Sequence, residues 1–416
     1  MCSDTKLMRN KLKKLIIEFE ERWVWKNLSA NMSLPFGIDI LERYQDRWSW
    51  NLISQNENVA WNLELLEKFK DKLSWNWIAN NESVPWCDEI LDTFAELIKW
   101  DILSGNRSIV WTESLIQKHI HRWDWLSLTR NTALPWSADL IKNYPGLSNG
   151  IALSRNNGLS WSICLIERFP SAWCWKSLSS NHGLPWDADF IEYFKDKLDW
   201  VLLSRNKSVK WSIELLEKFE DKWSWEDLSR NDHLPFDLAL IQRFEAKWDW
   251  RNLRKNSSVH CKPEVLEKYK NKLFGNFAHK TFSPSLTIED IENDIKRHDF
   301  VLLSLNHTQT WSLEMLEKYK NKWHWGCLSK RALLPWSFEL IDTYIERWDW
   351  ESLSKNPSLP LAVEMIEKYE DKWNWKSLSS NTALPLSIDL IKKYEKKWCW
   401  KSLSANPALL RCLTTA

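Results

Sequence analysis

The stretch WDWESLSKNPSLPL, residues 348–361, recurs in close copies with a fixed period of 25 from one end of this chain to the other. Its Asn lies in a column that aligns without a gap and is broken only by Thr281 and Arg331. A fixed period of this length is typical of a solenoid, in which each unit buries its apolar face by stacking on its neighbours. The sequence therefore predicts one elongated domain of about sixteen repeats. The Asn column consists of Asn31, Asn56, Asn81, Asn106, Asn131, Asn156, Asn181, Asn206, Asn231, Asn256, Asn306, Asn356, Asn381 and Asn406.

Tryptophan fills three further columns of the repeat, and of the 33 Trp residues only Trp77 lies outside them. Trp348, Trp350 and Trp336 represent the columns that lie eight residues before, six residues before and five residues after the Asn position. Burial of a large aromatic side chain is a larger energetic term than its use as a stacking platform for a ligand. We therefore expect these columns to form the core between repeats.

Each repeat is expected to contain a longer helix, called helix A here, and a shorter helix B. A typical helix A has a capping residue such as Ser212, an acidic residue such as Glu214 in its first turn, the aliphatic pair 215–216 and the aromatic Phe219. Pairs such as Glu214 and Lys218, four residues apart, predict a solvated outer face stabilised by ion pairs within the helix.

Helix B is expected to begin between the two closely spaced Trp columns, at a second capping position such as Ser224, and to include the pattern W-x-x-L-S. The regular spacing places Asn231 directly after it. Because Asn tolerates the left-handed conformation that ends many helices, we expect the Asn column to close helix B.

The predicted fold class is all-α, an α-solenoid of about sixteen 25-residue helix–turn–helix repeats. The alternative is a leucine-rich-repeat-like α/β solenoid, because the string L-S-x-N-x-x-L-P has a compatible period. Leucine-rich repeats need apolar residues five before and two after the Asn, where this chain has Glu351 and Ser358. The mismatch favours the helical solution.

The pattern W-x-W-x-x-L-S-x-N-x-x-L-P-W resembles tryptophan-rich 25-residue tandem-repeat arrays of uncharacterised function, over nearly the whole chain. It is loosely similar to tetratricopeptide-type superhelices, although it lacks their 34-residue period and their W-x-x-L-G-x-x-Y signature. The resemblance implies a helical-repeat solenoid and brings no activity with it.

Four segments are predicted along the chain. Residues 1–22 form an N-terminal capping helix, and residues 23–259 a regular repeat array with a bend near 145–150, where both closely spaced Trp are lost. Residues 260–310 hold degenerate repeats, interpreted as a seam or a binding region. Residues 311–416 form a second regular array whose C-terminal end is expected to be uncapped, because the last copy stops before its helix A.

Composition narrows the class of protein. The chain has 57 basic and 56 acidic side chains, a net charge of +1, so its overall charge favours no polyanionic partner. The eight Cys contain no CxxC pair and predict neither a disulfide framework nor a metal site. The first residues show no apolar signal segment, and no apolar run is long enough to span a membrane, so we expect a cytoplasmic protein.

No sequence motif indicates an enzyme or a cofactor. P-loop, GxGxxG, HExxH and GxSxG motifs are all missing. An acid–base or metal cluster around His279, His298 and the acidic residues between 289 and 299 is a third hypothesis, but relaxed repeat constraints alone would produce the same residues. We therefore expect no catalytic residue, no metal and no cofactor.

The position before the Asn column is basic through the middle of the array. If repeats stack as packed helices do, these side chains form a positive stripe at the ends of the B helices. The stripe predicts a polyanion or nucleic-acid site, although cations at a helix C-terminus also favour the macrodipole locally. Our first hypothesis is a scaffold that binds a protein partner over several repeats, with polyanion binding along this stripe as the alternative. The stripe consists of Arg130, Arg155, Arg205, Arg230, Lys255, Lys280, Lys330 and Lys355.

Overall fold

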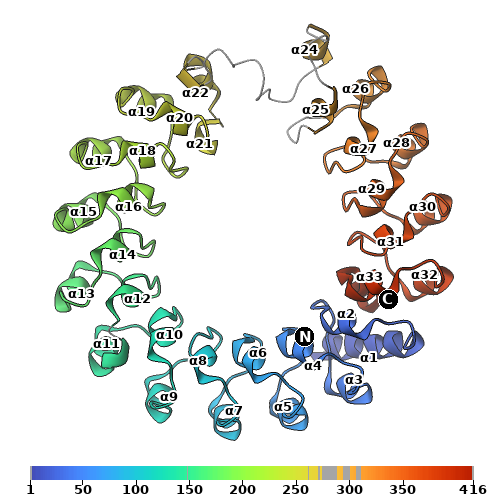
Figure 1. Cartoon of the computed structure of the whole chain (residues 1–416), viewed down its shortest axis with the longest axis horizontal. Helices are drawn as coiled ribbons and strands as arrows, with labels where there is room; N and C mark the ends of the chain where they lie inside the picture. The colour runs from blue at the N-terminus through green and yellow to red at the C-terminus, as the bar shows by residue number, and fades with distance from the viewer. Residues whose placement is uncertain are drawn as a thin grey trace. The chain divides into compact units, whose positions relative to one another are not determined.

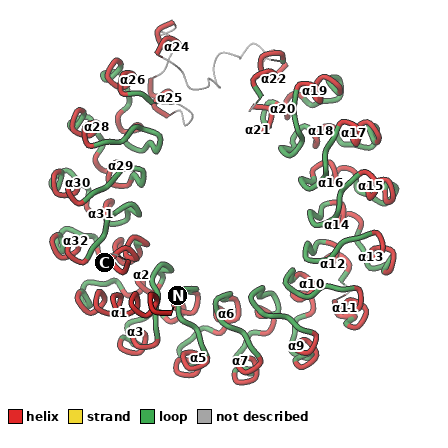
Figure 2. The backbone as a smooth tube through the Cα atoms, turned by 180° about the vertical axis from the view of Figure 1, so that it is seen from behind, coloured by secondary structure: helices red, strands yellow, loops and turns green. Residues whose placement is uncertain are grey.

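The computed structural model describes residues 2–147, 149–260, 262–269, 272–273, 288–293, 300–305 and 311–414. Every regular element in these ranges is a helix, and none is a strand. The all-α prediction is therefore confirmed for the described residues, and the α/β alternative is excluded there. The helices alternate between an outer row of A helices and an inner row of B helices, with irregular segments between them (Figures 1 and 2).

The chain divides into two compact units, and each is described by itself. Unit 1 combines residues 1–84 with residues 283–416, so it contains both ends of the chain. Its helices are α1 (Cys2–Glu18), α2 (Trp25–Ser29), α3 (Ile38–Arg43), α4 (Trp50–Gln55), α5 (Leu63–Phe69), α6 (Trp75–Asn80), α24 (Ile288–Asn293), α25 (Phe300–Leu305), α26 (Leu313–Lys318), α27 (Trp325–Leu328), α28 (Phe338–Thr343), α29 (Trp350–Lys355), α30 (Val363–Lys368), α31 (Trp375–Leu378), α32 (Ile388–Lys393), α33 (Trp400–Ala405), η3 (Pro407–Leu410) and α34 (Arg411–Thr414).

Unit 2 is the continuous segment 85–282. Its helices are α7 (Asp88–Thr93), α8 (Trp100–Leu103), α9 (Glu113–Lys118), α10 (Trp125–Arg130), α11 (Ala138–Asn143), η1 (Pro145–Leu147), α12 (Gly150–Ser154), α13 (Ile163–Arg168), α14 (Trp175–Ser179), α15 (Ala188–Phe194), α16 (Trp200–Arg205), α17 (Ile213–Lys218), α18 (Trp225–Leu228), α19 (Leu238–Arg243), α20 (Trp250–Leu253), α21 (Ser257–His260) and α22 (Pro263–Lys268). Helices this short are unstable in isolation, so contacts between repeats must stabilise them.

The predicted helix starts are mostly confirmed. Ser212 begins α17 by accepting the backbone N–H of Leu215, and the same bond recurs at most described A helices. In the B row, Ser224 accepts from Asp227, whereas Ser49 in the same column makes no capping bond. The second capping column therefore caps only some of the B helices.

Two of the three tryptophan columns form the core, as predicted, whereas most members of the column six residues before the Asn position, such as Trp225, are only half-buried. Trp225 at the start of a B helix packs against Trp248 and Phe244 of the following repeat, with ring centroids 5.0 and 4.9 Å apart. Trp248 is 4 % exposed, and its indole N–H donates to the carbonyl of Ile241 at 3.2 Å. Each interface between repeats is thus a cluster of aromatic rings whose geometry is partly edge-to-face, an arrangement that aromatic pairs prefer.

The predicted reason for the Asn column is wrong. Asn356 has φ −73° and ψ 113°, an extended conformation rather than a left-handed one. Its buried side chain instead ties two repeats together, because its Nδ2 donates to the carbonyls of Ser329 and Arg331, both at 3.0 Å, while its Oδ1 accepts the N–H of Ser358 at 2.9 Å. The first two acceptors lie 27 and 25 residues earlier in the chain. The column is therefore an inter-repeat hydrogen-bond ladder.

Arg331, which interrupts that column, keeps part of the bonding. Its Nε donates to the carbonyl of Ser304 at 2.9 Å, the acceptor 27 residues earlier that an Asn would use. Burial lowers the pKa of its guanidinium. This position of the repeat therefore requires a buried hydrogen-bond donor, and the longer side chain of Arg can supply it as well as Asn.

A second ladder runs through the Ser that precedes most of the Asn residues by two positions. Ser354 is fully buried, donates to the carbonyl of Trp350 at 2.6 Å and accepts the backbone N–H of Asn374 at 3.0 Å. The accepting bond holds the start of the next B helix. Together the Asn and Ser ladders satisfy backbone groups that these short helices would otherwise bury without partners.

The outer face is solvated and charged, but most of its ion pairs in the described part of the chain join neighbouring repeats, and only a few, such as Lys195 with Glu192, lie within one repeat. Lys218 lies 3.3 Å from Glu192, and Lys68 lies 2.7 Å from Glu42, each in the preceding repeat. Glu214, the predicted partner of Lys218, accepts bonds from its own backbone N–H and from Ser212, which lower its pKa. Exposed pairs of this kind contribute at most about 1 kcal/mol each.

The segment before α12 departs from the regular repeat. A short 3-10 helix, η1, takes the place of the turn that joins helix A to helix B in other repeats. It contains Gly146 and the buried Leu147. A Cβ on Gly146 would lie 2.6 Å from ring atoms of Trp125, so only glycine lets the chain cross that ring. Tyr144 consequently stacks on Trp125 at 24° between ring planes instead of tilting against it. This turn lies within residues 145–150, and the bend predicted there stays a prediction.

The first and last repeats of unit 1 pack against each other (Figure 1). Helix α2 contacts α33, and α1 contacts α34. The C-terminal residues 407–414, which the sequence left without a helix A to cover them, therefore lie against the first helix of the chain.

Candidate functional site

The basic stripe predicted from the sequence lies at the C-terminal ends of the B helices. Arg130, Arg155, Arg205, Arg230, Lys255, Lys330 and Lys355 are all exposed, and Lys280 lies outside the described residues. The B helices line the inner side of the curve that unit 2 forms (Figure 1). Exposure on one row of helices is what the stripe hypothesis requires, but the structure divides its members into two groups.

In the first group, carboxylates neutralise the cation. The Arg205 Nε lies 2.7 Å from Asp227 Oδ1, and Arg230 lies 2.6 Å from Glu226. Burial acts to raise the pKa of Asp227, but hydrogen bonds from Arg205 and Ser224 lower it overall, so this carboxylate is charged at neutral pH. Lys355 is paired in the same way, with Glu351 at 2.7 Å. These cations balance acids of the protein itself.

The second group has no carboxylate within ion-pair distance in the described part of the chain, and it comprises Arg130, Arg155, Lys255 and Lys330. Arg130 and Arg155 are the two that occupy successive repeats and share a hollow. The hollow has a volume of about 410 Å³ and lies between α10 and α12. We call it the two-arginine hollow; it is lined by Leu126, Arg130, Asn149, Ile151, Ala152, Arg155 and Asn156.

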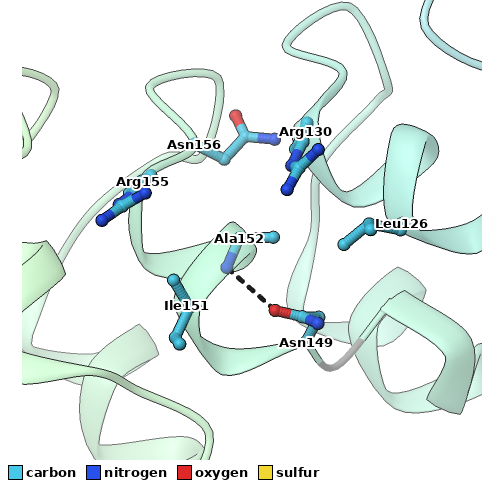
Figure 3. A pocket seen from close by; sticks show the side chains of 7 residues that line it. All are labelled: Leu126, Arg130, Asn149, Ile151, Ala152, Arg155 and Asn156. Atoms are coloured by element: carbon cyan, nitrogen blue, oxygen red, sulfur yellow. Dashed lines mark hydrogen bonds between the residues drawn. The ribbon is translucent and has the colours of Figure 1, made fainter.

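The floor of the two-arginine hollow is apolar. Figure 3 shows Leu126 extending toward Ala152 from the α10 side, Ile151 on α12, and both arginines at the same end of the hollow as Asn156. Leu126 is 40 % exposed and Ile151 is 56 % exposed. Leu126 and Arg130, like Ile151 and Arg155, are four residues apart and so share one face of their helix.

One wall of the hollow belongs to a repeat that has lost a tryptophan. Gly150 stands at the position that Trp125 and Trp175 occupy in the neighbouring repeats. A Cβ on Gly150 would lie 2.9 Å from the carbonyl oxygen of Ala172, so the backbone has closed over the space that the indole would need. The exception in the pattern thus coincides with this surface depression.

The polar groups of the hollow, apart from the arginines, are already bonded. The Asn149 side chain accepts the backbone N–H of Ala152 at 3.0 Å and caps α12. Asn156 Nδ2 donates to the carbonyls of Thr129 and Asn131 at 2.7 and 3.2 Å. The hollow therefore offers two guanidinium groups and aliphatic surface, and neither a nucleophile nor a general base lines it.

A second hollow, of about 280 Å³, lies in the A row beside the same repeats. Trp136, Ile141, Leu159 and Leu165 supply its apolar lining, and Arg168 at its rim is paired with Asp139 at 2.9 Å. It carries no unpaired charge, so we give it no role.

Titratable groups elsewhere serve the fold. Burial lowers the pKa of His119, which takes the core aromatic position and packs against Trp100 with ring centroids 5.0 Å apart and 36° between ring planes. In the described ranges no group of three His, Cys, Asp or Glu side chains could hold a metal ion. The hypothetical cluster at His279 and His298 lies outside the described residues.

Cys174, on the repeat after the two-arginine hollow, is a partly exposed thiol. Hydrogen bonds with Ser177 lower its pKa, and the charge of Arg155 contributes to the same shift.

None of the helices in the described part has the length and hydropathy needed to cross a bilayer.

Comparisons of the chain with protein-family models, with curated proteins and with solved structures gave no match. By its own sequence and structure the chain is a tryptophan-rich helical repeat protein, whose helices recur with a 25-residue period. Sequence reasoning found both arginines but missed Leu126 and Ile151. The signal was present, because these two positions carry charged side chains in several other repeats, for example Glu226 and Glu351.

Proposed function

We propose that this chain is a non-enzymatic scaffold that binds an extended segment of a protein partner through the B helices, and that the two-arginine hollow is the centre of that surface. The observation that carries the proposal is the juxtaposition of two unpaired guanidinium groups with exposed Leu126 and Ile151. Guanidinium groups suit carboxylates, which they bind through paired hydrogen bonds, and aliphatic surface suits aliphatic side chains. The partner segment therefore carries acidic side chains close to apolar ones.

The alternative, a nucleic acid or other polyanion bound along the whole stripe, is less well supported. A phosphate backbone needs a run of free cations, and the pairing of Arg205, Arg230 and Lys355 interrupts that run. Aliphatic side chains beside the free arginines also have no role in contacts to a phosphate backbone. The resemblance to tryptophan-rich arrays adds no activity to either proposal. A cytoplasmic location, consistent with cysteines that form no framework, is part of the first proposal.

The proposal is tested with defined probes on the full-length chain. Binding is measured for a fluorescent peptide of alternating Leu and Glu, for an all-Glu peptide of equal charge, and for single-stranded oligo-dT. We expect the Leu–Glu peptide to bind most tightly and with the weakest dependence on salt. Tightest binding by oligo-dT, with a steep loss of affinity as salt rises, would establish the polyanion alternative.

Two variants locate the site. Arg130→Ala combined with Arg155→Ala should reduce affinity for the Leu–Glu peptide at least tenfold. The matched control is Arg230→Ala combined with Lys355→Ala, which removes two stripe cations that are already paired, and it should leave the affinity unchanged. Equal losses in both variants would mean that total charge, and not the hollow, determines binding. The same variants then serve as baits in lysate, with and without nuclease, to identify the natural partner.

A further inference from the structure

The contact between the first and last repeats reproduces a regular repeat interface. We call this contact the terminal clasp; it consists of residues 18–31 against residues 392–406, together with α1 against α34. Asn31 Nδ2 donates to the carbonyls of Ser404 and Asn406, both at 3.1 Å. If the first repeat is treated as the one that follows the last, its residue numbers increase by 400, the length of sixteen 25-residue repeats. Asn31 then becomes position 431, which is 27 residues after Ser404 and 25 residues after Asn406. These are the spacings of the Asn ladder elsewhere.

The other elements of the repeat interface are also present. The backbone N–H of Val24 donates to Ser404 Oγ at 3.1 Å, as Asn374 does to Ser354 within the chain. Trp400 packs against Trp23 with ring centroids 5.0 Å apart and 80° between ring planes, which matches Trp375 against Trp398 at 4.8 Å and 75°. The first repeat therefore stands in register after the last one.

Charge complementarity on the outer side completes the clasp. Arg22 Nε lies 2.8 Å from Glu395 Oε1, and Lys392 Nζ lies 2.8 Å from Glu18 Oε1. Each end thus contributes one cation and one anion, in opposite order. All four side chains are more than a third exposed, so the pairs select a partner more than they add stability.

The clasp differs from the other described interfaces in one respect: its two faces belong to repeats that do not follow each other in the chain. Opening it breaks no chain connection and exposes two faces that are complementary to each other. We propose that the terminal clasp is an interaction surface for a second copy of this chain, in which the N-terminal repeat of one copy docks on the C-terminal repeat of the other. Such an exchange replaces each intramolecular contact by an identical intermolecular one, so only concentration and chain entropy decide between them.

Two complementary full-length variants test the exchange. The first, Glu18→Lys with Arg22→Glu, reverses the charges of the N-terminal face. The second, Lys392→Glu with Glu395→Arg, reverses those of the C-terminal face. Within either variant alone, like charges oppose each other across the clasp. In a mixture, both possible clasps between unlike copies are complementary.

The measurement is native mass spectrometry of each variant, of their equimolar mixture and of the variant that combines all four changes. We expect a species of twice the chain mass, containing one copy of each variant, to be at least tenfold more abundant in the mixture than the doubled species of either variant alone. The four-fold variant restores complementarity within one chain and should remain a single copy. It also shows, by its circular dichroism, that reversed pairs are compatible with folding.

A mixture without mixed species would overturn the proposal, provided that the four-fold variant folds. If the variant with all four substitutions does not fold, exchange is tested on the wild-type chain instead. Isotope-labelled and unlabelled wild-type copies are unfolded together in urea and refolded at high and low concentration. Mixed species that increase with concentration support exchange, and their absence at both concentrations refutes it.

Discussion

Replacing one member of the Asn ladder should lower the free energy of unfolding strongly, although the asparagine side chain carries no charge. Asn356 is suited to this test because it is 3 % exposed and lies away from both the two-arginine hollow and the terminal clasp. Asn356→Ala removes three hydrogen bonds: the Ser329 carbonyl and the Ser358 N–H lose the bonds they make with this side chain, while the Arg331 carbonyl keeps its bond from the Trp336 indole N–H. A lost bond to a buried polar group costs about 1–3 kcal/mol, and water entering the small space left by the side chain offsets part of this. We expect a loss of about 2–4 kcal/mol.

The substitution Asn356→Gly separates the ladder from the helix-ending role that the sequence suggested. Glycine adopts the left-handed conformation more easily than Asn, so a helix-ending role predicts an unchanged or increased stability. Because Asn356 is extended and its side chain carries the bonds, we expect Gly to be worse than Ala, by up to about 1 kcal/mol of added backbone entropy.

The assay is urea unfolding followed by circular dichroism and Trp fluorescence, together with hydrogen exchange of the amides in α27 and α29. Repeat proteins lose stability locally, so exchange in the two repeats that Asn356 joins should accelerate most. The exposed Ser358 supplies the control, since Ser358→Ala keeps the N–H that Asn356 accepts and should change stability by less than about 0.5 kcal/mol. Equal effects of Asn356→Ala and Ser358→Ala, or a stable Gly variant, would refute the ladder.

Three other predictions concern buried or paired groups. Ser354→Ala removes a hydroxyl that bridges two repeats and should cost about 1–2 kcal/mol in urea unfolding, whereas unchanged unfolding would mean that the Ser ladder is dispensable. Burial, followed by its bond to Glu317, raises the pKa of Tyr344 from 10.0 to about 12, so its contribution to stability is present below pH 10 and is lost between pH 10 and about 12; Tyr344→Phe should lower stability at neutral pH and flatten its decline over this interval. Burial raises the pKa of Cys412 to about 12, so in a variant with Cys412 as its only cysteine a thiol reagent should react slowly, and faster once the charges of the N-terminal clasp face are reversed; equal rates would show that the reagent reaches Cys412 by a route other than an open clasp.

The candidate site was only half visible in the sequence. Arg130 and Arg155 stood out because their column is basic in many repeats. Column membership alone could not tell them from Arg205, whose partner Asp227 belongs to the following repeat, outside any short-range rule for pairing. Leu126 and Ile151 were missed because an aliphatic residue on a short helix is usually a core residue, and only the charged residues of their column in other repeats, such as Glu226, indicate exposure. Their exposure depends on which face of helix B meets solvent.

The sequence by itself determined the repeat, its length, the helical class and the burial of two of the three tryptophan columns. It could do so because a 25-residue unit that cannot bury its own apolar face must place the same residues at the same interface each time. Capping residues such as Ser212 bond to backbone groups within one helical turn, so the sequence also predicted them.

Only the tertiary structure decided how the repeats are joined. Asn356 bonds to carbonyls 25 and 27 residues earlier in the chain, and Lys218 pairs with Glu192 of the preceding repeat. These contacts form because the stacking of neighbouring repeats places their side chains and backbone groups within bonding distance. The terminal clasp lies furthest from sequence reasoning. The Asn31 side chain bonds to the carbonyl of Ser404, 373 residues away in the chain, and no local pattern of residues indicates a contact at that separation.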